Sequence, residues 1–271
     1  MKPAMKPAYL PCARLARARQ RGYSLIELMV AMVLAVFLLA GLFTIFQGTR
    51  HTSTEQTELA QLQDNERLAM TILTDVIQQA GYYPNPATNS QTDALPVDGA
   101  RFPTAGQGVS GSSNNATQGD NLVVRYATNQ SDGVLNCVGV SNTAGPNGLV
   151  YTQTFQINTS QQLTCQPNTG IAAAPLVNNI VSMTVSYGVN TTSTATAANC
   201  PADTYVPTAS MTTLYWTNVC SAWITLTFVN PLYQPPGQAL PTPGQPSTIT
   251  FQRVIGIMGK SGTDVVVSVT S

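Results

Sequence analysis

One carboxylate stands at a place where an unpaired carboxylate is costly. Glu27 follows the segment Arg21-Gly22-Tyr23-Ser24-Leu25-Ile26, and the nineteen residues after it, 28–46, carry no charge. An acid at the edge of such an apolar run is a candidate functional residue, because burying it without a partner is expensive. The alternative is a flanking Glu whose carboxylate reaches the lipid headgroups and has no further role.

A partner for Glu27 would arise if the chain were cut after Gly22. Tyr23 and Glu27 are four residues apart, so they share one face of a helix. Cleavage would create a cationic α-amine at Tyr23, and a buried amine next to a buried carboxylate removes the penalty that each would carry alone. Pairing within one chain is possible, but pairing with Glu27 of a neighbouring chain would fix the axial stagger of packed helices.

The apolar run itself has the length of a membrane span. Residues 28–46 read LMVAMVLAVFLLAGLFTIF. A helix of that length extends about 28 Å, close to the roughly 30 Å of a bilayer core. A fully buried core helix is the alternative interpretation, but the basic residues before the run favour the membrane.

The charges are distributed so as to orient this helix. The net charge of the chain is zero, from 12 basic and 12 acidic residues. Six of the basic residues lie within the first 21 residues, which contain no acid, and the rest of the chain has a net charge of −6. Basic residues stay on the cytoplasmic side of a membrane helix, so the body of the chain is predicted to be exported. Such a balance argues against nucleic-acid binding.

An ordinary secretory signal is a weaker interpretation of the N-terminal segment. The apolar stretch exceeds the usual 7 to 15 residues, and no small-x-small cleavage site follows it. An uncleaved anchor that carries a periplasmic enzyme or binding module stays open as an alternative.

The cysteines fit an exported body. Cys12 lies in the basic leader, and four cysteines remain beyond it: Cys137, Cys165, Cys200 and Cys220. An even number in an exported domain indicates disulfides, for which three pairings are possible. We favour the pairing of nearest neighbours, Cys137 with Cys165 and Cys200 with Cys220, because these pairs enclose a strand pair and a loop respectively.

Catalytic and metal-binding chemistry lacks the residues that it needs. The only histidine is His51, beside the apolar run, so the body has none for a Ser-His-Asp or Cys-His arrangement. No CxxC pair indicates zinc, and the acids after residue 80 do not have EF-hand spacing, although a calcium site in a loop stays open. We therefore expect no enzymatic activity, no cofactor and no resident metal.

The elements that position these residues are predicted from periodicity. Apolar residues continue at spacings of three and four through residues 55–80 until Gly81, which predicts one helix over 23–81 with the membrane segment at 28–46. A polar loop region at 82–121 follows, and residues 122–271 are β-rich. Strands are expected at 122–127, 149–157, 163–165, 180–187, 222–229, 249–257 and 265–269. The predicted class is α+β, a long helix packed on an antiparallel sheet.

The N-terminal pattern resembles a known signal. Gly22 followed by Tyr-Ser-Leu-Ile-Glu and an apolar helix is similar to the class III signal of type IV pilins and of type II secretion pseudopilins. The resemblance implies that residues 1–22 are a leader, that prepilin peptidase cuts between Gly22 and Tyr23, and that Tyr23 is then N-methylated. It also implies that Glu27 serves assembly. Translation could start at Met1 or at Met5 without changing the mature chain.

Three further segments resemble the PilW family of minor pilins. They are NERLAMTILTDVIQQAGYY at 65–83, NLVVRYA at 121–127 and LVNNIVSMTVSYGV at 176–189. The resemblance implies a pilin-like fold and a role in priming type IV pilus assembly near the tip, with other minor pilins, the major pilin and a tip adhesin as partners. The implied location is the inner membrane, with the body periplasmic, and then the pilus. A J-type pseudopilin of a type II secretion system is the alternative.

Overall fold

The computed structural model comprises two compact units, residues 1–54 and 55–271. It describes residue 22 and residues 24–115, 117–143, 145–168, 170–192, 200–233 and 245–260. The leader up to residue 21, Tyr23 and the strand expected at 265–269 lie outside the described residues.

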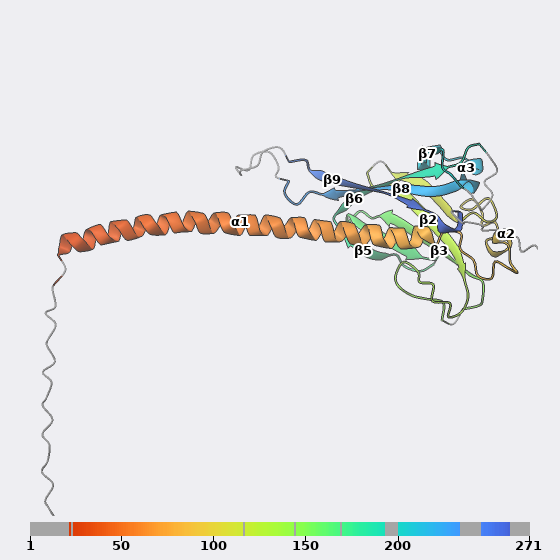
Figure 1. Ribbon diagram of the computed structural model, residues 1–271, viewed down its shortest axis with the longest axis horizontal. Helices are drawn as coiled ribbons and strands as arrows, with labels where there is room; N and C mark the ends of the chain where they lie inside the picture. Colours follow the sequence, from red (N-terminus) through yellow and green to blue (C-terminus); the bar gives the residue numbers. More distant parts are fainter. Residues whose placement is uncertain are drawn as a thin grey trace, which may run out of the picture. The chain divides into compact units, whose positions relative to one another are not determined.

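A single helix, α1 (Leu25–Gln78), contributes to both units (Figure 1). Its bounds lie within the predicted range of 23–81. The helix ends because Gly81 adopts a left-handed backbone with φ of 75°, and its N–H donates to the Arg125 carbonyl at 2.9 Å instead of continuing the helix.

The C-terminal part of α1 lies on the sheet through one apolar stripe. Its fully buried residues recur at helical spacing. They are Leu62, Ala69, Met70, Leu73, Val76 and Ile77. These side chains form one core with the inner face of the sheet, so the predicted packing of the helix on a sheet is confirmed.

The described residues form one sheet of nine strands. Its strands are β1 (Val109–Asn115), β2 (Gly119–Thr128), β3 (Leu149–Ile157), β4 (Gln162–Pro167), β5 (Ala174–Asn178), β6 (Ile180–Val189), β7 (Thr204–Pro207), β8 (Val219–Val229) and β9 (Thr248–Gly256). The order is β5-β4-β3-β2-β6-β8-β9, with β1 on β2 and β7 on β6. All pairs are antiparallel, as predicted, except β2 with β6, which is parallel, so the sheet is mixed.

The parallel contact between β2 and β6 is a single ladder position held by two residues. Gly119, at φ of 86°, pairs with Met183, and a Cβ there would collide with the Met183 carbonyl. The neighbouring Asp120 carboxylate accepts hydrogen bonds from the Val185 N–H at 2.9 Å and from the Thr208 hydroxyl at 3.1 Å. This junction joins the β1–β5 part of the sheet to the part formed by β6–β9.

The predicted polar loop at 82–121 is wrong in part, because it contains the short helix α2 (Gln91–Ala94), all of β1 and the start of β2. The sequence of β1, VSGSSNN, has almost no apolar residues. It is a strand because β2 supplies its hydrogen-bond partners and because Gly111 leaves room for the buried Tyr187 hydroxyl, which a Cβ would strike.

The rest of this region is organised by a buried cation. The Arg125 side chain is 1% exposed, and its guanidinium donates to the carbonyls of Gln107 and Pro96 at 2.6 Å. Longer bonds reach the carbonyls of Leu95 and Thr104 at 3.3 and 3.4 Å. The guanidinium also lies 4.2 Å from the centre of the Phe102 ring. Arg125 thereby joins several turns of one loop.

The protonation of Arg125 does not change near neutral pH. Burial lowers its pKa to about 10, and the nearby Asp98 opposes this shift. Because the pKa is lower in the folded chain than in the unfolded chain, stability gains from deprotonation only as the pH rises above about 10. The charged form and its hydrogen bonds therefore persist over the physiological range.

Replacing Arg125 with Met is expected to destabilise the chain by about 2 to 4 kcal/mol, because buried carbonyls lose their donor. Denaturant unfolding of the full chain measures the effect, and Arg101→Met, which removes an exposed arginine from the same loop region, is the control. Equal stability of the two variants would contradict the role given to Arg125.

Candidate functional site

The candidate processing site lies at the start of α1. Gly22 is exposed and precedes the helix, and the Ser24 carbonyl accepts the first hydrogen bonds, from the N–H groups of Glu27 and Leu28 at 3.0 and 3.2 Å. Glu27 is therefore in the first helical turn, where a negative charge interacts favourably with the helix dipole. Its predicted neighbour Tyr23 lies outside the described residues.

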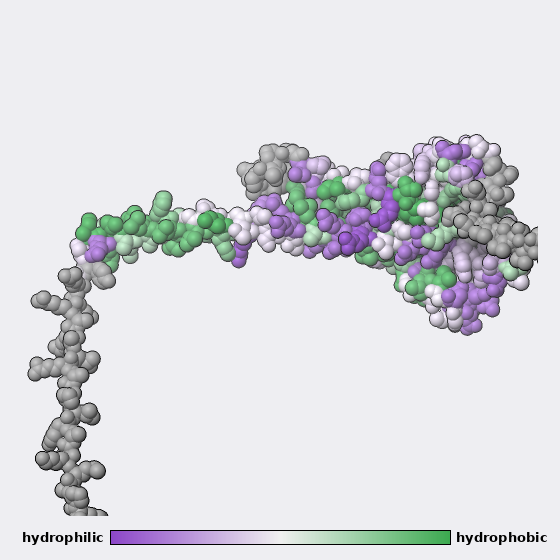
Figure 2. Space-filling model, viewed as in Figure 1, coloured by the Kyte–Doolittle hydropathy of each residue, from purple (hydrophilic) through white to green (hydrophobic). Residues whose placement is uncertain are grey.

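The apolar residues after Glu27 are exposed all around the helix. Among the large apolar side chains of this segment, exposure ranges from 51% at Val30 to 77% at Phe37. By length and composition, the helix could cross a membrane. Figure 2 shows this segment as mostly green atoms on the face in view. Such a surface is far larger than the apolar patches that soluble monomers expose, so it requires lipid or other apolar helices around it.

The apolar segment ends at a basic residue. The guanidinium of Arg50 lies 4.5 Å from the centre of the Phe46 ring, the last apolar residue of the run. A long cationic side chain that lies along an aromatic ring is typical of a membrane interface, where the aliphatic stem is buried and the charge is hydrated. Within the apolar segment, the Thr44 hydroxyl donates to the Gly41 carbonyl one turn earlier at 2.8 Å, so this donor is satisfied inside the helix.

Two disulfides join Cys137 to Cys165 and Cys200 to Cys220, with Cα–Cα distances of 6.4 and 5.5 Å. This is the pairing favoured from the sequence. The first disulfide connects the loop before β3 to β4, and the second connects the segment before β7 to β8. Both therefore hold long connections onto the sheet.

One described acid, Asp132, stabilises the turn that follows β2. Asp132 accepts hydrogen bonds from the Thr128 hydroxyl and from the N–H groups of Asn129 and Val134. Partial burial raises the pKa of this carboxyl, but the hydrogen bonds outweigh it and lower the pKa overall. Among the described residues, no three His, Cys, Asp or Glu side chains lie close enough to hold a metal ion.

Two important residues were not identified from the sequence. Arg125 organises the loop before β1. It could have been identified from the sequence, because it is the one charged residue in the apolar run 122–127. Asp120 holds the parallel junction, but nothing in its polar sequence context distinguishes it from other loop acids.

Comparison with known proteins supports the N-terminal interpretation and extends it to the sheet. Residues 17–43 match the model of the prokaryotic N-terminal methylation motif, and residues 140–253 match the family model of type IV pilus-assembly protein W. The chain is 26% identical over 196 residues to a pilin-like protein, PilA3, from Thermus thermophilus, covering 71% of this chain and 78% of that protein.

Among solved structures, the chain is similar to a type IV-like pilin from Thermus thermophilus. The identity is 14%, the TM-score is 0.41, and the match covers 74% of this chain and 97% of that one. The predicted resemblance to type IV pilins, including the PilW type, is confirmed by the two family models.

The disulfides are expected to be complete in the mature protein and to stabilise it. In the chain-entropy model, each loop contributes about 3 to 4 kcal/mol. A Cys137→Ala and Cys165→Ala double variant should therefore unfold at lower urea concentration than the parent chain, and reduction should destabilise the parent more than the variant, which has one disulfide left. Mass spectrometry of the unreduced mature protein checks the pairing, and four free thiols would refute it.

Proposed function

We propose that this chain, a type IV pilin-like protein with an N-terminal methylation motif and a PilW domain, is a minor pilin that takes part in type IV pilus assembly. Prepilin peptidase cuts it between Gly22 and Tyr23, and Tyr23 is methylated. The mature chain is then held in the inner membrane by residues 28–46 until it joins the fibre.

The observation that carries this proposal is a helix that is apolar on every side and has one acid at its beginning. The side chains of residues 28–46 are exposed in the isolated chain, so a bilayer or a bundle of like helices must cover them. A bilayer covers these side chains before assembly, and neighbouring pilin helices cover them afterwards. A permanent anchor would need the same apolar length but would have no use for Glu27.

Glu27 and the new N-terminus provide the polar contact in this apolar surrounding. Both groups carry a charge, and neither can be transferred into an apolar helix bundle alone without a large penalty. Pairing of the Tyr23 amine of one subunit with Glu27 of another satisfies both charges at a single axial stagger. Subunits that are shifted along the helix axis leave both charges unpaired, so the pair selects the register.

The charge distribution sets the direction of transfer. The six basic residues of the leader stay in the cytoplasm and are removed with it, while the body, with its net charge of −6, is exported. The periplasm is an oxidising compartment, which is where the two disulfides can form.

The family match favours a place in the pilus over a place in a secretion system. Residues 140–253, which form much of the sheet, match a pilus-assembly family, whereas the N-terminal motif alone would serve a J-type pseudopilin equally well. We propose that the chain acts with other minor pilins and the major pilin in the priming complex at the fibre tip, where it helps carry an adhesin.

The mature N-terminus is expected to be methylated Tyr23. Intact-mass and N-terminal analysis of the protein from its native membrane measures this directly. Gly22→Val should block cleavage and leave the full leader attached, whereas Ser24→Ala, on the other side of the cut, should be processed normally. A mature chain that still begins at Met1 or Met5 would rule out the pilin pathway and favour an uncleaved anchor.

Glu27→Ala is expected to reduce incorporation into fibres by at least about tenfold, equivalent to ~1.4 kcal/mol, because the amine of a neighbour loses its partner. The fraction of the protein in sheared pili relative to membranes is the measurement. Asp64→Ala removes an exposed acid from the same helix and should leave this fraction unchanged. The pairing role is wrong if the two variants assemble alike.

A further inference from the structure

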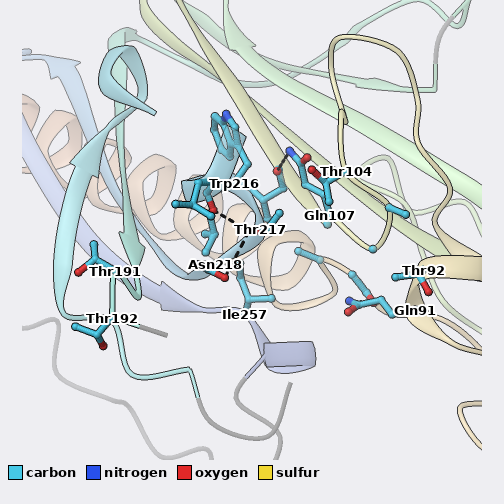
Figure 3. Close-up of a pocket in the computed structure, with 18 residues that line it drawn as sticks. Gln91, Thr92, Thr104, Gln107, Thr191, Thr192, Trp216, Thr217, Asn218 and Ile257 are labelled. Carbon is cyan, nitrogen blue, oxygen red and sulfur yellow. Dashed lines mark hydrogen bonds between the residues drawn. The ribbon is translucent and has the colours of Figure 1, made fainter. Parts of the chain in front are cut away.

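A cavity in the sheet-containing unit has no role in anchoring or processing. It has a volume of about 530 Å³, which is within the usual range of small-molecule sites. Its walls come from the turn after α1, helix α2, the loop before β1, the segment after β6, the start of β8 and the short helix α3 (Thr213–Thr217). Figure 3 shows side chains from these separate segments around a common space.

The described lining of this cavity carries no charged side chain. Its polar residues are amides and hydroxyls, and they include Gln91, Thr104, Gln107, Thr191, Thr192 and Asn218. A charged ligand would lose its hydration here without meeting an opposite charge, which is unfavourable. A purely apolar ligand would bury these amides without partners. The lining therefore fits a neutral molecule with many hydrogen-bonding groups.

Several lining groups have unused hydrogen-bonding capacity. Gln107 is only 3% exposed and its Nε2 donates to the Val109 carbonyl at 2.8 Å, but its Oε1 accepts no hydrogen bond from any described residue. No described residue accepts a hydrogen bond from the Asn218 Nδ2. An unpaired acceptor and an unpaired donor in one cavity match a ligand whose groups both donate and accept.

One aromatic residue is among the described residues that line the cavity. Trp216 lines it, and its ring is held by an edge contact with the buried Tyr187, at 4.7 Å between ring centres and an angle of 66°. An indole presents a negative face to which polarised C–H groups are attracted. The C–H face of a pyranose ring is such a surface, and its hydroxyls both donate and accept hydrogen bonds.

We propose that this cavity binds a neutral saccharide, with Trp216 as the wall for the C–H face of a sugar ring and with Asn218 and Gln107 among its hydrogen-bond partners. An extended peptide offers only one donor and one acceptor per residue and is usually bound along an open strand edge. A saccharide presents several hydroxyls around one ring and suits a cavity whose polar groups come from many directions.

The test uses the full mature chain in nanodiscs of phosphatidylcholine, because detergents with sugar headgroups would occupy the site. Binding to an immobilised panel of neutral glucose, galactose and N-acetylglucosamine oligosaccharides is measured, followed by calorimetry with any glycan that is retained. We expect at least one neutral glycan to bind. Failure of the whole panel, or equal retention of sialylated and neutral glycans, overturns the proposal.

Variants then locate the binding. Asn218→Ala removes an unpaired donor without a strong internal bond and should weaken the affinity about 2- to 10-fold, the effect of one hydrogen bond. Gln252→Ala, an exposed amide on β9, is the matched control and should bind like the parent chain. Gln107→Leu should also weaken binding, provided that its unfolding midpoint equals that of the parent.

The same experiment separates the alternatives. If Asn218→Ala and Gln252→Ala bind glycans equally, the site lies elsewhere and the proposal is wrong. If a displayed library of neutral peptides is retained through Asn218 while glycans are not, the cavity is a peptide site and the saccharide assignment is also wrong. Neither result tests the proposed role in fibre assembly, because both variants leave Gly22, Tyr23 and Glu27 unchanged.

Discussion

An apolar helix surface must be covered from water, and the rest of this structure depends on how the two parts of α1 are covered. Its residues 62–77 bury their stripe under the inner face of the sheet, so this part is covered within the chain. Residues 28–46 are apolar on all sides and exposed, so their cover must come from outside the chain. The first cover makes a folded domain. The second requires a membrane or other helices, and under the proposed function it places Glu27 where pairing with the amine of a neighbouring chain would select the register.

The sheet under α1 consists of two antiparallel parts that meet at one parallel position. With so little backbone pairing between β2 and β6, the parts are joined mainly by the shared core and by Asp120, whose carboxylate bonds to Val185 and Thr208 of the second part. The helix stripe belongs to the same hydrophobic core as buried residues of both parts. Packing of the helix therefore stabilises the sheet, and the sheet in turn buries the apolar stripe of the helix. Gly119 is needed at the junction because any side chain there would force the two parts of the sheet away from each other.

Whether an element could be predicted from the sequence depended on whether the residues that determine it lie close together in the chain. The helix was predicted at 23–81 and is observed at 25–78, and β3 was predicted at its observed bounds, because apolar periodicity and turn residues lie next to one another in the sequence. Strand β1 could not be predicted, because its Ser, Asn and Gly residues have no preference for a strand. Only pairing with β2 makes this segment a strand. The short strands β5 and β7 are likewise defined by their partners β4 and β6.

The two candidate sites differ in the same way. Gly22, Tyr23 and Glu27, the residues proposed for processing and assembly, lie within six residues, so this candidate site can be identified from a short segment of the sequence. The cavity lined by Gln107, Trp216 and Asn218 exists only after segments more than a hundred residues apart have been brought together. Its residues all belong to the unit 55–271, and the processing residues all belong to the unit 1–54. Because distant residues without shared partners act additively, substitutions in the cavity are expected to leave the proposed processing and assembly of the helix unchanged.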